Sequence, residues 1–315
     1  MIIRDKQDLR KCVKQCVRRS DAIETKICFD PMSFSADRIS FAAGHPLTGR
    51  SLMQYAALSA MNLPVHDPVK AEIMLHSSNA EEILQTALAS MRAKKVYVRI
   101  PVQNDGWSCA DERMIPVVTV SHDMFTPGRF GIDYQEAARR LINSLEMAGS
   151  HDVVLERYEP HAFMYCMLPV CEDTGAVAHL HFEDQEEMAK ALEALSLHPD
   201  VRTLISADAE IECKLIELAA PMQNVLVRLS SLEHIGQAIS ILGTRFLPFA
   251  SQAHTPEEMV GAWSCAKEKI WQALYDAYLL LARTGYEITR EQIEEDVERI
   301  FVSNAEALYQ MNEHE

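Results

Sequence analysis

The longest uninterrupted helical pattern of apolar and polar positions lies near the C-terminus, in the stretch 255–283. It begins with Thr255 as a cap residue, a proline at the first helical position and Glu258 three residues after the cap. Between residues 271 and 282 only Gln272 and Asp276 are polar. A helix that is apolar on every side is buried on every side. We therefore expect this helix in the protein core or in a subunit contact.

A shorter pattern recurs along the chain: an apolar strand, a capping residue and an amphipathic helix. The three copies read HSSNAEEILQTAL, HFEDQEEMAKAL and RLSSLEHIGQAI, and they follow predicted strands at 71–76, 177–182 and 225–229. Capping and helical period alone can make such strand–turn–helix units look alike. Internal duplication and independent origin of the units therefore both stay open.

The middle of the chain has the clearest predicted topology. Asp133 and Asp184 are each followed three residues later by glutamate, which indicates two capped helices. Without one extra strand the order is β-α-β-β-α-β, which is the ferredoxin-like, split βαβ arrangement. The predicted strands of this region are 114–121, 151–158, 162–170, 177–182 and 201–206.

The remaining pattern predicts a mainly helical C-terminal region. Thr289 caps a final amphipathic helix to about residue 311. Its polar side carries four glutamates, which we take as a candidate interaction surface: Glu291, Glu294, Glu295 and Glu298. The predicted fold is therefore a mixed α+β fold. It has an N-terminal α/β region (1–104), a ferredoxin-like region (112–219) and a helical region (220–315) packed on the rest.

Composition places the chain among ordinary globular proteins. It has 315 residues, of which 48% are hydrophobic and 24% charged. Its first residues are charged and lack the apolar segment of a secretory signal, and no apolar run approaches the ~18 residues of a membrane span. The eight cysteines are scattered, which is typical of reduced thiols. We therefore expect a cytoplasmic protein.

The formal charge of −16 argues against nucleic acid and against anionic membranes as partners, because both attract cationic surfaces. The charge is uneven, since residues 256–315 hold thirteen Asp and Glu against five Arg and Lys. An acidic helical surface suits a basic protein partner or self-association. Two solvated helix faces explain the same pattern without a partner.

His179 and His181 are the candidate metal ligands. Residues two apart in a strand point to the same face, so both imidazoles can converge on one ion. Zinc would need further ligands, which could come from cysteine, histidine or glutamate elsewhere. On a solvated sheet face the pair would have no function.

Catalytic motifs are absent from the sequence. There is no G-x-S-x-G, no phosphate-binding glycine loop and no dinucleotide fingerprint. We therefore expect a non-enzymatic adaptor, chaperone or regulatory subunit without a cofactor. The alternative is a small-molecule enzyme or a metal- or ligand-binding protein with no readable signature. Its active site would lie on loops, where the polar residues are His45, Arg50, His122, Asp123 and Arg129.

Overall fold

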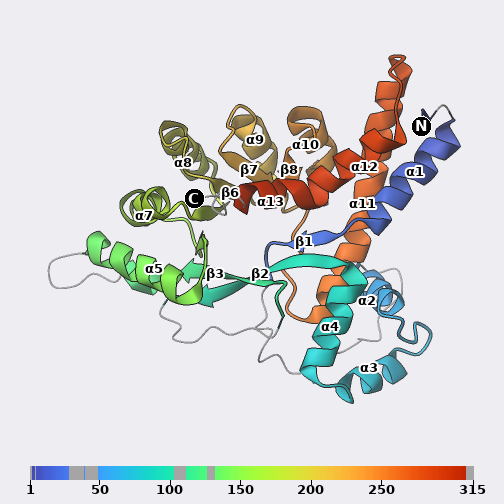
Figure 1. Cartoon of the computed structure of the whole chain (residues 1–315), viewed down its shortest axis with the longest axis horizontal. Coiled ribbons are helices and arrows are strands. Elements are labelled where there is room, and N and C mark those ends of the chain that lie inside the picture. The colour runs from blue at the N-terminus through green and yellow to red at the C-terminus, as the bar shows by residue number, and fades with distance from the viewer. Residues whose placement is uncertain are drawn as a thin grey trace. The chain divides into compact units, whose positions relative to one another are not determined.

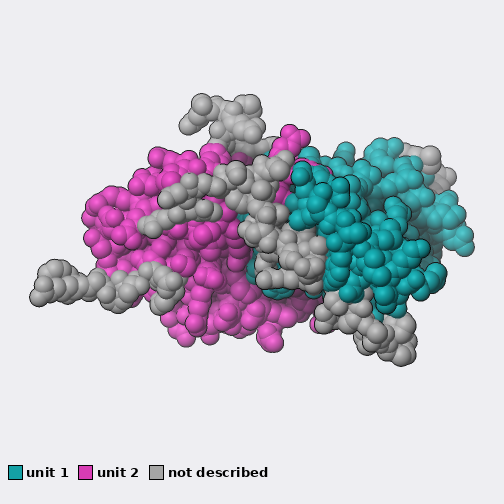
Figure 2. Space-filling view, turned by 90° about the horizontal axis from the view of Figure 1, so that it is seen from below, with its two compact units in different colours: residues 1–98, 249–302 teal, residues 99–248, 303–315 magenta. Residues whose placement is uncertain are grey.

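Two compact units make up the chain (Figure 2). Residues 1–98 and 249–302 form unit 1, and residues 99–248 and 303–315 form unit 2. The computed structural model describes residues 2–3, 5–27, 39, 49–102, 111–125 and 132–309. Each unit is therefore assembled from segments that lie far apart in the sequence.

Eight strands succeed one another across the sheet in the order in which they occur along the chain. Wherever the structure gives the register of two paired strands, the pair is parallel. Sequential parallel strands joined by helices form the plan of the TIM barrel, so the fold is TIM-barrel-like α/β. The strands are β1 (Ala22–Glu24), β2 (Ala93–Pro101), β3 (Met114–Val120), β4 (Asp152–Leu155), β5 (Val177–Phe182), β6 (Thr203–Ala207), β7 (Val225–Arg228) and β8 (Phe246–Leu247).

Unit 2 contains strands β3 to β8 and the helices that connect them. All five residues of β6 are buried, as expected for a parallel strand covered on both faces. Figure 1 shows three of the connecting helices, α8, α9 and α10, side by side. The helices after β3 to β7 are α5 (Tyr134–Ala148), α6 (Pro160–Ala162), α7 (Leu168–Thr174), α8 (Gln185–Leu197), α9 (Ala209–Ala219) and α10 (Ile235–Leu242).

Unit 1 is organised around α11 (Pro256–Arg283), which packs against three other helices. The prediction of a core helix is confirmed for one face, on which Met259, Trp263 and Ile270 are buried within the unit. The expected burial on every side is wrong for the last turns, since Ala277 is half-buried and Leu280 is 61% exposed. At Gly261 a side-chain carbon would meet the backbone carbonyl of Met53, so glycine allows α11 and α2 to approach closely. The partners are α1 (Lys6–Arg19), α2 (Gly49–Ala60) and α4 (Ala80–Met91).

The prediction of a ferredoxin-like middle region is wrong. That arrangement needs antiparallel pairs, whereas β3 to β6 are all parallel. The predicted strand 162–170 is helical instead, because Glu159 caps a helix whose first residue is Pro160. The predicted strand 71–76 is likewise part of a helix, α3 (Pro68–His76), which Asp67 caps. Periodicity cannot separate short buried strands from short buried helices.

The C-terminal region departs from one continuous predicted helix. It consists of α12 (Arg290–Glu298), a π-helical turn (Arg299–Ser303) and α13 (Asn304–Tyr309). Unit 1 ends within the π-helical turn, at Val302, and α13 belongs to unit 2. Among the described residues, no helix combines the length and apolar character that crossing a membrane requires.

Candidate active site

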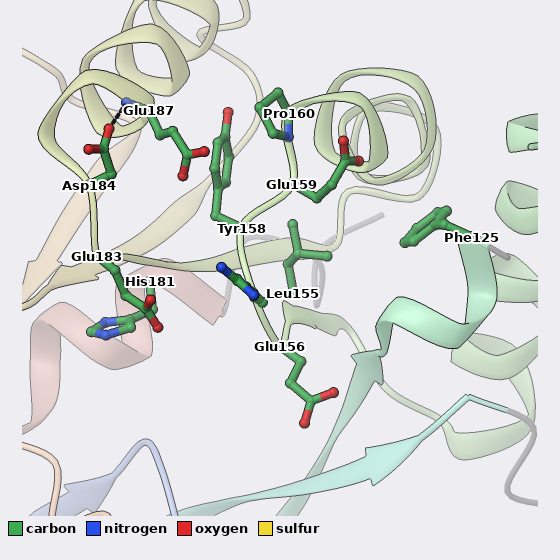
Figure 3. A pocket seen from close by; sticks show the side chains of 11 residues that line it. Phe125, Leu155, Glu156, Tyr158, Glu159, Pro160, His181, Glu183, Asp184 and Glu187 are labelled. Carbon is green, nitrogen blue, oxygen red and sulfur yellow. Dashed lines mark hydrogen bonds between the residues drawn. The ribbon is translucent and has the colours of Figure 1, made fainter.

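The carboxyl ends of β4 and β5 bring polar side chains of unit 2 together, and Phe125, which follows β3, lies beside them. In TIM-barrel enzymes this is the edge of the sheet at which active sites lie. Here the edge borders a cavity of about 970 Å³, near the upper end of the range for small-molecule sites (Figure 3). The lining residues are Phe125, Leu155, Glu156, Arg157, Tyr158, Glu159, Pro160, His181, Glu183, Asp184 and Glu187.

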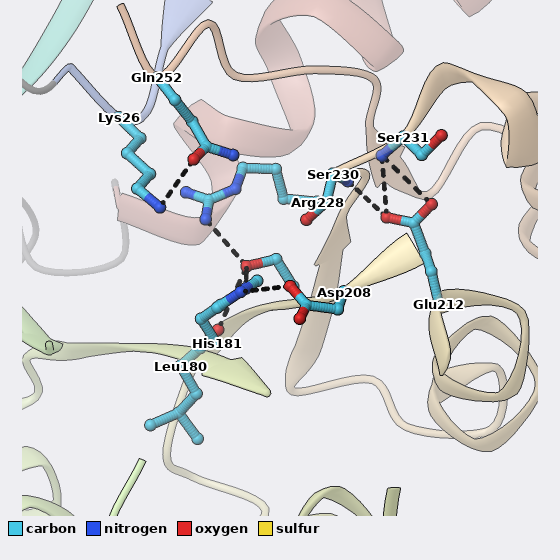
Figure 4. Close-up of polar contacts among 10 residues, drawn as sticks. Lys26, Leu180, His181, Asp208, Glu212, Arg228, Ser230, Ser231 and Gln252 are labelled. Atoms are coloured by element: carbon cyan, nitrogen blue, oxygen red, sulfur yellow. Dashed lines mark hydrogen bonds and ion pairs between the residues drawn. The ribbon is translucent and has the colours of Figure 1, made fainter. Parts of the chain in front are cut away.

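His181 is held at the cavity by two hydrogen-bond partners on β6 and just beyond it. Its Nδ1 lies 3.1 Å from Ser206 Oγ, and its Nε2 lies 3.1 Å from Asp208 Oδ1. The register places Ser206 opposite His181, which explains the first contact. Arg228 on β7 donates to the same Ser206 oxygen over 2.9 Å (Figure 4).

The direction of these hydrogen bonds follows from the chemistry of the groups. Arg228 can only donate, so the Ser206 oxygen accepts from it, and the hydroxyl hydrogen of Ser206 is available to His181 Nδ1 or to the Leu180 carbonyl. Asp208 as a carboxylate accepts from the Nε2–H of His181. Ser206 can donate either to His181 Nδ1 or to the Leu180 carbonyl, so the arrangement accepts the imidazole with or without a proton on Nδ1, as an acid–base group requires.

Tyr158 stands in the wall of the cavity. Its ring lies 4.8 Å from the ring of Phe182 and 5.8 Å from that of Phe163, centroid to centroid. Burial raises the pKa of Tyr158 to about 12, and the nearby charges of Glu187 and Glu159 add to the rise. The phenol therefore keeps its proton at neutral pH and can donate a hydrogen bond.

His179, the second predicted metal ligand, is buried on the same face of β5. Its Nε2 lies 3.0 Å from Asp152 Oδ1 and 3.2 Å from the hydroxyl of Tyr309. Burial lowers the pKa of His179 and raises the pKa of Asp152, because both charged forms are desolvated. The two groups form a buried hydrogen-bonded pair that is not part of the cavity lining.

The predicted metal site stays a prediction. The strand alternation that suggested it is confirmed, since His179 and His181 share one face of β5. Their ring nitrogens have different partners, as described above. In the part of the chain that the structure describes, no three His, Cys, Asp or Glu side chains are grouped closely enough for a metal ion.

The predicted interaction surface also stays a prediction. Its four glutamates, Glu291, Glu294, Glu295 and Glu298, all lie exposed on α12. Glu294 accepts a hydrogen bond from Arg290 one turn earlier on the same helix, over 2.7 Å.

The loop residues proposed as active-site candidates under the enzyme alternative cannot be assessed in this structure. His45 and Arg129 lie outside the described residues, and so do the side chains of Arg50, His122 and Asp123. The sequence reasoning did not single out Tyr158, Asp208 or Glu187, and it considered Glu183 only as a further ligand of the predicted metal site. These residues share one feature in the sequence: each lies within a few residues of the end of a strand. That feature indicates an active site only when the strands are known to be parallel.

A second buried carboxylate was missed as well. Glu212, in the first turn of α9, is fully buried and accepts hydrogen bonds from the backbone N–H groups of Ser230 and Ser231. His234 Nδ1 lies 2.8 Å from the same carboxylate. Burial raises the pKa of Glu212. The group fastens the loop after β7 to α9, and Figure 4 shows the contacts to the two serines.

Comparison by sequence finds no relatives: no protein-family model and no curated protein matches the chain. Comparison by structure finds solved structures with a similar fold. A uronate isomerase from Bacillus halodurans aligns with a TM-score of 0.83 at 16% identity, covering 97% of both chains. A uronate isomerase from Thermotoga maritima aligns with a TM-score of 0.66 at 10% identity, covering 96% of this chain and 97% of that one.

A third structure has the same kind of fold. Glucuronate isomerase from Caulobacter crescentus aligns with a TM-score of 0.55 at 10% identity, covering 98% of this chain and 95% of that one. These likenesses contradict the expected adaptor, chaperone or regulatory subunit, and the expectation that the chain is not an enzyme, because these three structures, which align over nearly the whole chain, are isomerases. At these identities the comparison establishes the TIM-barrel-like fold that the strand order shows.

Proposed function

We propose that this chain is a sugar isomerase that interconverts an aldose and the corresponding ketose. The observation that carries the proposal is the likeness, over 97% of both chains, to a uronate isomerase. The cavity at the carboxyl ends of β4 and β5 supports it, because it lies where TIM-barrel enzymes bind their substrates.

The reaction needs acid–base groups and no net oxidant. A base removes the proton from C2, the C1=C2 enediol forms as O1 is protonated, and the proton returns to C1 as O2 loses its own. The carboxylates of Glu183 and Glu187 line the cavity and can serve as the base at carbon. We assign the proton transfer between the two oxygens to His181, which Asp208 holds in a fixed orientation.

Deuterium exchange tests the proposal. The purified protein is incubated in D₂O with aldoses of three charge types: uronates, neutral hexoses and amino sugars. We expect one class to give ketose with deuterium incorporated at carbon, observed by NMR. Loss of one general acid–base group costs typically about 10²–10⁴-fold in rate, so H181N should lower kcat by that order.

A matched control separates catalysis from folding. His151 is an exposed histidine directly before β4 and does not line the cavity, so H151N should leave the rate unchanged. If none of the sugars incorporates deuterium, or if H181N and the wild type react equally fast, the assignment is wrong.

A further inference from the structure

The Tyr158 side chain places a hydroxyl group where a polar ligand in the cavity can contact it. Its ring is largely buried, and among the described residues its hydroxyl has no protein hydrogen-bond partner, so that group is left to the cavity. In Figure 3 the ring stands between Glu187 on one side and Glu159 and Pro160 on the other. Because Tyr158 lines the cavity, a ligand bound there can exchange a hydrogen bond with its hydroxyl.

The charges around that hydroxyl are mostly negative. Glu159 and Asp184 are committed to backbone N–H groups at the starts of α6 and α8. Glu156, Glu183 and Glu187 line the same cavity, and none of the three forms an ion pair among the described residues. Arg157 is the one arginine or lysine of the described lining.

This lining distinguishes ligands by charge. Carboxylates accept hydrogen bonds from sugar hydroxyls and attract an ammonium group, whereas they repel another carboxylate. The chain's formal charge of −16 acts in the same direction at longer range. The lining is therefore suited to a neutral or cationic sugar and unsuited to the uronates named for the similar structures.

We propose that the cavity selects an amino sugar, an aldose with an ammonium group, held by the Tyr158 hydroxyl and by the carboxylates of Glu183 and Glu187. This inference rests on the proposed function for its sugar ligand and narrows the substrate class of the same site.

Three sugars that differ at a single carbon test the selection. Calorimetric titration at neutral pH compares 6-amino-6-deoxy-D-glucose, D-glucose and D-glucuronate, whose C6 groups are positive, neutral and negative. We expect the amino sugar to bind about tenfold or more tightly than glucose, and glucuronate to bind least tightly, with the differences shrinking in high salt. Glucuronate binding as tightly as the amino sugar would overturn the proposal, and so would no binding of any of the three.

Charge-neutralising variants locate the effect. E183Q and E187Q should each weaken binding of the amino sugar and strengthen binding of glucuronate, while Y158F should weaken binding of all three sugars alike. Glu186 lies exposed on α8, pairs with Lys190 and does not line the cavity, so E186Q is the matched control. An equal effect of E186Q and E187Q would mean that general surface charge, not the cavity, discriminates.

The two proposals fail in different ways. Deuterium exchange into glucuronate without any preference for the amino sugar would leave the isomerase proposal standing and remove the amino-sugar inference. Selective binding of the amino sugar without exchange into any sugar would keep the inference about the cavity and remove the isomerase proposal.

Discussion

Glu257, in the first turn of α11, is a carboxylate in an apolar setting. It is 6% exposed, its Oε1 accepts a hydrogen bond from the Thr255 hydroxyl over 2.6 Å, and its Oε2 is buried without a partner among the described residues. Burial is the main reason why the pKa of Glu257 is raised to about 7. A helix start normally favours negative charge, so desolvation outweighs the helix dipole here.

The raised pKa predicts how stability depends on pH. Between about pH 4.5 and about pH 7 the folded protein holds a proton that the unfolded chain has released. The Glu257 contribution to the free energy of unfolding therefore falls as pH rises through this window and is constant above it. E257Q should remove that slope and stabilise the protein at pH 8 by up to about 3 kcal/mol, with little effect at pH 4.

Urea unfolding at a series of pH values measures this effect. The matched control is E258Q, because Glu258 is the next residue and is exposed. A pH slope that E257Q leaves unchanged would show that Glu257 is ionised in the folded protein throughout the range.

At the scale of elements, helix starts were the most predictable feature. Asp133 and Asp184 accept hydrogen bonds from the first-turn N–H groups of α5 and α8, as their sequence pattern predicted. Capping depends on residues within one turn, so it can be inferred locally. The prediction of a strand at 162–170 was wrong because this segment is buried by residues far away in the sequence, which a local pattern does not show.

The close contact between α11 and α2 predicts the effect of adding a single methyl group at Gly261. A side-chain carbon at Gly261 would overlap the Met53 carbonyl, so G261A should destabilise the protein by roughly 1–3 kcal/mol, despite the higher helix propensity of alanine. Gly236 in α10 has nothing within 4 Å of the same position, so G236A should instead stabilise by about 0.5–1 kcal/mol. Thermal unfolding of both variants checks the opposite signs, and equal shifts would contradict the close packing.

At the scale of the whole molecule, α13 ties the end of the described chain to unit 2. Tyr309 contacts His179, and Arg202 donates to the Leu308 carbonyl over 2.6 Å. The Asn304 side chain donates to the carbonyls of Thr244 and Phe246. The segment is therefore part of the core structure of unit 2.

Removal of residues 304–315 should loosen unit 2 selectively. Hydrogen–deuterium exchange followed by mass spectrometry should show faster exchange in β5, β6 and β8, because α13 contacts these strands or the residue before β6. Helices α1 and α11 belong to unit 1 and should exchange at the original rate. Unchanged protection in β5 would mean that α13 contributes little to the stability of the unit.

The sequence by itself determined the position of α11, the caps of α5 and α8 and the strands β3, β5, β6 and β7, because periodicity and capping are local properties. It also placed His179 and His181 on one face of a strand, since alternation needs no tertiary information. Only the tertiary structure decided that the strands are parallel. It therefore also decided that His181, Tyr158 and the cavity glutamates meet at one edge of the sheet. Strand pairing joins residues that are distant in the chain, and in this sequence no local pattern recorded it.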